Sequence, residues 1–172
     1  MGAPSGRRLR GTLARTMRVE VSRQATKSRV VSTEEVRSAA EAMLRSLKLP
    51  RAELSVLLCD DATIHALNRD YRKKNKPTDV LAFAMREGDD GHLAGDLLGD
   101  VIISLETATR QAKERAVVTR DEVMMLLAHG LLHLLGWDHQ TDADDQRMRA
   151  ETDRMLAVIR RAAAAKAKRA AG

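Results

Sequence analysis

Apolar positions along the chain divide it into short strands and longer helices. Alternating or continuous apolar residues predict strands over 19–22, 53–58, 78–85 and 97–104. Apolar residues at helical spacing predict helices over 34–47, 61–72, 105–116, 123–135 and about 144–161. The order shows neither a regular strand–helix alternation nor an internal repeat. We therefore expect one α/β (α+β) domain, in which helices pack on a small mixed sheet.

Polar residues before two of these helices match the capping-box pattern, in which a hydroxyl and a glutamate three residues later bond each other's backbone. Ser32 with Glu35 predicts one helix start, and Thr119 with Glu122 predicts another. The helix that follows Thr119 is apolar nearly all round, which is typical of a helix buried at the centre of a domain.

Charge is distributed unevenly along the 172 residues, whose net charge is +6. Residues 1–16 hold four arginines and residues 158–172 hold five lysines and arginines, both without an acid. The middle keeps 21 cations against 24 acids. We expect a basic extension over 1–16, one domain over 17–157, and a basic tail over 158–172. The extension loosely resembles a transit peptide, but a dispensable extension is the simpler interpretation. The tail is either disordered or prolongs the last helix.

Composition bears on the cellular compartment of the protein and on how it could bind nucleic acid. A single cysteine, Cys59, excludes an internal disulfide and fits a reducing cytoplasm. No apolar run approaches the length of a bilayer span, so we expect no membrane association. The aromatic residues are Tyr71, Phe83 and Trp137 alone. Such a chain cannot build the stacking platforms of common single-strand RNA modules, and would handle nucleic acid through phosphates and a metal.

Three histidines lie within the segment HGLLHLLGWDH, residues 129–139. His129 and His133 are four residues apart, so a helix places them on one face. Gly136 allows the helix to end in a left-handed residue, after which His139 can return toward the other two. Three imidazoles converging on one point would bind Zn²⁺ and leave a fourth position open, as in catalytic sites. The alternative is two core-facing histidines and a surface one.

The same spacing matches the zinc site of the metzincin peptidases in its ligands and its glycine. Those enzymes need a glutamate directly after the first histidine as general base, and this chain has Gly130 there. The metal geometry is therefore kept without the peptidase base, and the sequence does not identify another base.

A basic segment follows the predicted helix over 61–72. Its five cations are Arg69, Arg72, Lys73, Lys74 and Lys76. The segment is either a solvated helix end or a phosphate-binding patch. Arg72 is the foremost candidate, because a guanidinium holds phosphate in a bidentate fork that lysine cannot make.

Three other polar residues have weaker claims to the site. Asp138 either bonds a ligand imidazole or caps the following turn. His65 and His92 are poor candidates for metal ligands, because His65 falls on a helix surface and His92 in a Gly/Asp-rich loop.

Four motifs in order, LNRDYR, KPTDVLAF, LLGDVIIS and HGLLHLLGWDH, resemble those of the YbeY family of bacterial rRNA-maturation endoribonucleases, over residues 50–156. The resemblance implies a zinc-dependent, single-strand-specific endoribonuclease that acts in 16S rRNA 3′-end maturation and late ribosome quality control. The implied partners are single-stranded RNA, 16S rRNA and the small ribosomal subunit. By the same resemblance, His129, His133 and His139 are the zinc ligands, and Arg72 is the catalytic residue.

The chain departs from the family pattern at three positions, none of them a ligand. Ala82 and Ala84 stand where the family usually has Ser and Pro, and Trp137 where it usually has Tyr. Two other functions remain open: a metallopeptidase-like hydrolase using the same three histidines, and a ribosome-associated binding factor with structural zinc.

Overall fold

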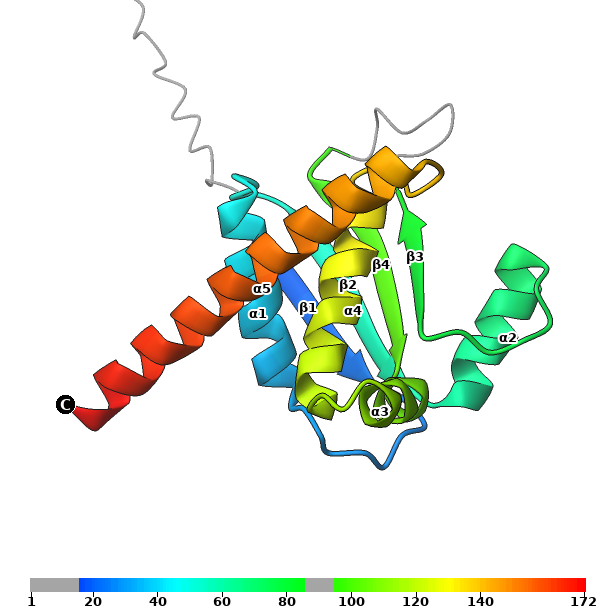
Figure 1. Cartoon of the computed structure of the whole chain (residues 1–172), viewed down its shortest axis with the longest axis horizontal. Coiled ribbons are helices and arrows are strands. Elements are labelled where there is room, and N and C mark those ends of the chain that lie inside the picture. Colours follow the sequence, from blue (N-terminus) through cyan, green and yellow to red (C-terminus); the bar gives the residue numbers. More distant parts are fainter. Residues whose placement is uncertain (1–15, 86–94) are drawn as a thin grey trace, which may run out of the picture.

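The computed structural model describes residues 16–85 and 95–172. Figure 1 shows helices packed on a twisted sheet. The strands are β1 (Arg18–Arg23), β2 (Glu53–Cys59), β3 (Val80–Ala84) and β4 (Leu97–Ser104). The helices are α1 (Thr33–Ser46), α2 (Asp61–Arg72), α3 (Leu105–Glu114), α4 (Thr119–Leu134) and α5 (Asp142–Ala171). The expected mixed α/β domain is confirmed.

The sheet has the order β1-β2-β4-β3, with β3 antiparallel to β4 and the other neighbours parallel. Alternate strand residues enter two separate cores, as the pleat requires. Val56 and Val101 are paired across β2 and β4 and belong to the main core, with α1, α4 and α5. Leu81 and Ile102 point to the other face, where they pack with Ile64 of α2. The antiparallel edge strand β3 is thus held between α4 and α2.

Helix α4 is the central buried helix that the sequence predicts. It lies between the sheet and α5, and contacts both (Figure 1). Its close approach to the sheet depends on Gly130, which is buried. A Cβ atom built there would lie 2.7 Å from Val101 Cγ1 and 3.2 Å from Val80 Cγ2. Glycine is therefore required by packing, and this position faces the sheet.

The helix starts agree with the sequence in one of two predicted capping boxes. Ser32 Oγ accepts from the Glu35 amide at 3.0 Å, and Glu35 accepts in return from the Ser32 amide at 2.8 Å. The box at Thr119 was wrong: Val118 is the N-cap residue of α4 and gives no side-chain cap. Glu122 instead points inward, is buried, and pairs with Arg115 at 3.2 Å. Glu122 therefore pairs with Arg115, at the end of α3, and does not cap the start of α4.

Helix α5 continues through most of the predicted basic tail and ends at Ala171, as the helical alternative expected. Most of the extension over 1–16 and of the predicted Gly/Asp-rich loop, including His92, lies outside the described residues. Within the described ranges, no helix is long and apolar enough to cross a membrane.

Replacing Gly130 with alanine should lower the free energy of unfolding by about 1–3 kcal/mol, because the added methyl group overpacks a closely packed contact with Val101. Urea unfolding followed by circular dichroism measures this. In an exposed helix the same change would stabilise by roughly 0.5–1 kcal/mol, since alanine is the better helix former. A more stable Gly130→Ala protein would therefore show that α4 is not in tight contact with the sheet.

Candidate metal centre

The three histidines of the HGLLHLLGWDH segment come together at the C-terminal end of α4. The Nε2 atoms of His129 and His133 are 3.1 Å apart. The ring centroid of His139 lies 5.8 Å from that of His129 and 5.3 Å from that of His133. One nitrogen from each ring falls within 4.8 Å of the others. In the described part of the chain, this is the one group of histidine, cysteine and carboxylate side chains with such spacing.

A turn at Gly136 brings His139 back to the helix. Gly136 has a φ of 85°, in the left-handed region that favours glycine. Its amide bonds the His133 carbonyl at 3.0 Å, and the Trp137 amide bonds the Leu132 carbonyl at 3.0 Å. These two bonds form the Schellman motif, which satisfies the last carbonyls of the helix and reverses the chain. The predicted left-handed ending at Gly136 is therefore present.

The donors are suited to a cation in both protonation and spacing. Burial lowers the pKa of His129 below its ordinary 6.5, and the neighbouring His133 and His139 lower it further. Burial, followed by His139, lowers the pKa of His133 in the same way. The two rings are therefore neutral near pH 7. Two nitrogens bound tetrahedrally at about 2.05 Å from Zn²⁺ would be about 3.3 Å apart, close to the separation of the two Nε2 atoms.

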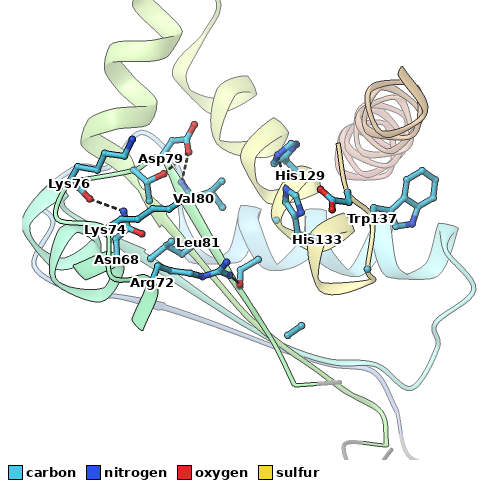
Figure 2. A pocket seen from close by; sticks show the side chains of 16 residues that line it. Asn68, Arg72, Lys74, Lys76, Asp79, Val80, Leu81, His129, His133 and Trp137 are labelled. Carbon is cyan, nitrogen blue, oxygen red and sulfur yellow. Dashed lines mark hydrogen bonds between the residues drawn. The ribbon is translucent and has the colours of Figure 1, made fainter. Parts of the chain in front are cut away.

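Beside the histidines lies a cleft of about 560 Å³, shown in Figure 2. We call it the metal cleft. His129 and His133 form one wall, β3 lies along the floor, and the end of α2 with its following loop forms the opposite wall. The cations that line it are Arg72, Lys74 and Lys76. The histidine motif and part of the basic segment, which lie far apart in the sequence, therefore face the same cavity.

Arg72 is exposed but held in place by the edge strand. Its Nη2 donates a hydrogen bond to the Ala82 carbonyl. Its guanidinium carbon lies 5.4 Å from the centroid of the Phe83 ring, within reach of a cation–π interaction. Its positive charge also contributes to the lowered pKa of His133, so the two groups interact electrostatically across the cleft.

The basic segment is divided by the end of α2. Arg69 pairs with the Asp70 carboxylate at 2.8 Å, and Lys73 Nζ donates to the Asp70 carbonyl at 3.1 Å. Neither lines the metal cleft, whereas Lys74 and Lys76 do. Three of the five cations therefore line the metal cleft, and the other two lie outside it at the exposed end of the helix.

Asn68 was not identified from the sequence, although it shapes the cleft. It is buried on α2, one turn after Ile64, and its side-chain amide donates to the Lys76 carbonyl at 2.8 Å. The backbone carbonyl of Asn68 accepts a hydrogen bond from the Lys74 amide at 3.2 Å. These bonds fix the loop that carries both lysines. The sequence does hold one sign of this role, because Asn68 places a polar side chain on the apolar face of the helix, beside Ile64.

Asp79 is a second residue that was missed. It lines the metal cleft, and its Oδ1 accepts from the Val80 amide at 2.7 Å. Its Oδ2 accepts from Gln111 Nε2 at 3.0 Å, so its carboxylate is fixed from α3. It contributes negative charge that opposes the lowering of the His129 pKa.

The remaining candidates have local roles. The Asp138 carboxylate accepts from the backbone amide of the next residue, His139, at 2.7 Å, and Thr141 rather than Asp138 caps the helix that follows. His65 Nε2 bonds the Asn75 side chain at 2.8 Å and is not part of the three-histidine group.

Comparison with known proteins gives one consistent result. The family model described as endoribonuclease YbeY matches residues 20–160. A Syntrophotalea carbinolica protein named endoribonuclease YbeY is 45% identical over 136 residues, which cover 78% of this chain and 91% of the relative. An Aquifex aeolicus protein of the same name is 45% identical over 121 residues, which cover 70% of this chain and 79% of the relative.

A solved structure agrees in fold. The solution structure of a Thermotoga maritima protein superposes with a TM-score of 0.60 and 22% identity, covering 84% of this chain and 89% of that one. At this identity the match supports the fold alone. Together, the family match and the close relatives show that the chain belongs to the endoribonuclease YbeY family.

Proposed function

We propose that this chain is a zinc-dependent endoribonuclease that cuts single-stranded RNA. The observation that carries the proposal is a group of three histidines, two of which line the same basic cleft as Arg72. Family membership supports internal cleavage of RNA. The finer proposal is 16S rRNA 3′-end maturation and late ribosome quality control in the cytoplasm, with the small ribosomal subunit as partner.

His129, His133 and His139 would hold the zinc ion. Three imidazole nitrogen donors with one open position match catalytic zinc sites, whereas structural sites are closed by a fourth protein ligand. When bound, Zn²⁺ supplies a Lewis acid that polarises a phosphate oxygen or lowers the pKa of water to about 7.

Arg72 would bind the scissile phosphate. Its hydrogen bond to the Ala82 carbonyl and its cation–π contact with Phe83 hold the guanidinium at the edge of the cleft before substrate arrives, so little reorganisation is needed. A fixed guanidinium offsets the negative charge that develops on the phosphate as the bond breaks. Lys74 and Lys76 would bind adjacent phosphates, since both line the same wall.

The peptidase alternative is disfavoured by the position of Gly130. A peptidase of this spacing needs a glutamate there, but the position faces Val101 and Val80 at distances too short even for a methyl group. The cations of the metal cleft also suit a polyanion better than a peptide.

His133→Ala should abolish metal binding, whereas His65→Ala should keep about one Zn²⁺ per chain. Elemental analysis of the purified proteins measures this, and circular dichroism verifies the fold. Because burial keeps His129 and His133 neutral to below pH 6.5, wild-type protein should retain zinc at that pH and lose it only on further acidification. Full zinc occupancy in His133→Ala would overturn the ligand assignment.

Arg72→Ala should keep its zinc and lose cleavage by roughly 10²–10³-fold, because it removes a fixed positive charge at the reacting phosphate. The matched control is Arg69→Ala, since Arg69 lies on the same helix but outside the cleft. Initial rates on a single-stranded RNA measure the effect. An Arg72→Ala enzyme as active as the control would remove Arg72 from the site.

RNA affinity should fall with rising salt, since lysines and arginines that bind phosphate release counterions. For a short RNA that only fills the cleft, Lys74→Gln/Lys76→Gln should reduce the slope of log K against log salt by about 1.4. Arg69→Gln/Lys73→Gln serves as the control of equal charge. Equal slopes for the two variants would contradict the assignment of Lys74 and Lys76 to the phosphate path.

A further inference from the structure

The last part of α5, residues Arg160–Ala171, extends past α1 into solvent (Figure 1). We call it the basic arm. All of its residues are exposed. It holds five cations and no acid: Arg160, Arg161, Lys166, Lys168 and Arg169. It also lies almost entirely beyond residues 20–160, the part that matches the family model.

The two ends of α5 differ in how their cations are neutralised. Near the start of the helix, Arg147 pairs with Asp144, Arg149 with Asp145 at 2.8 Å, and Arg154 with Glu151. By contrast, no cation of the basic arm makes an ion pair or hydrogen bond with any residue in the described ranges 16–85 and 95–172. Within these ranges the positive charge of the arm is therefore not neutralised by ion pairs, although Lys166 lines a groove that Glu34, Glu35 and Glu41 also line.

The arm has physical reasons to remain helical without a partner. It prolongs a helix whose earlier turns are anchored in the core by Met148, Met155 and Ile159, so the cost of nucleation is already met. Alanine, the best helix former, supplies all seven of its other positions. Cations near the C-terminus also complement the helix dipole. The charges are thus displayed on a semi-rigid rod.

Cations on α5 also form a row that leads back to the metal cleft. Arg147, Arg154, Arg161 and Lys168 recur every seven residues, so each lies about 20° around and about 10.5 Å along the helix from the last. At the near end, Arg147 lines a small cavity with Trp137 and Asp138, both of which also line the metal cleft. The free charges lie at the far end of this row.

We propose that the basic arm binds the phosphate backbone of RNA whose cleaved segment occupies the metal cleft. The inference rests on the proposed ribonuclease function and adds a second contact with the same substrate, remote from the cut. Unpaired cations without acids suit a polyanion, and phosphate supplies one charge per nucleotide. The arm has no aromatic residue to stack on bases, so binding there is independent of sequence.

The test compares Arg161→Gln/Lys168→Gln with a control of equal charge, Lys27→Gln/Lys113→Gln. Lys27 and Lys113 are exposed and lie off α5. Fluorescence anisotropy on the full-length zinc protein measures affinity for two RNAs, a short one that fills only the cleft and a long one that can reach the arm. Gel analysis after each measurement verifies that the RNA is intact. Initial cleavage rates of the short RNA are measured alongside.

For the long RNA, loss of two phosphate contacts should reduce the salt slope by about 1.4, which corresponds to roughly tenfold weaker binding at 0.2 M salt. Binding and cleavage of the short RNA should match those of wild type, and the control should match wild type on both RNAs.

Equal affinity of the arm variant and wild type for the long RNA, with short-RNA cleavage intact, would overturn the arm proposal alone. An equal loss in the control would also overturn it, by showing a general charge effect. Failure of the wild-type protein to bind or cleave the short RNA would instead refute the proposed function.

Discussion

The close contact between α4 and the sheet is the constraint on which the site depends. With no side chain at Gly130, the helix approaches Val101 and Val80 closely enough to hold its histidines beside β3. The same strand provides the carbonyl and the aromatic ring that hold Arg72. One strand therefore sets the relative position of the metal ligands and the phosphate-binding group. The glycine that permits this contact also removes the base that a peptidase would need.

The charge of the ionisable side chains differs between the metal site, the cleft beside it and the two ends of α5. Burial and mutual proximity keep His129 and His133 neutral, which a metal site requires. Arg72, on the opposite wall, increases this effect at His133, and together with Lys74 and Lys76 it makes the metal cleft attractive to phosphate. Elsewhere, all three arginines of α5 that precede the basic arm pair with carboxylates one turn away, while the cations of the arm make no such pair with the described residues. In the described part of the chain, cations without an ion-pair partner therefore occur both in the metal cleft, at Lys74 and Lys76, and on the basic arm.

Local patterns in the sequence predicted most elements and the histidine cluster. The four-residue spacing of His129 and His133 and the break at Gly136 are properties of one continuous segment, so they could be recognised without a fold. The inward turn of Glu122 could not, because it depends on Arg115 at the end of another helix. Asn68 and Asp79 were missed for a similar reason, since their roles come from contacts made after folding. The division of the basic segment likewise depends on how α2 is oriented against β3.

The most direct test of the account is cleavage of a single-stranded RNA spanning a 16S rRNA 3′ end by the full-length protein. Zinc-loaded, metal-stripped and zinc-restored samples of one preparation are compared, beside a His129→Ala protein purified identically. We expect cleavage by the zinc-loaded and zinc-restored samples and none by the metal-stripped sample or the His129→Ala protein. Equal cleavage by all four would mean that the activity belongs to a contaminant, and no cleavage by the loaded protein would contradict the proposed function.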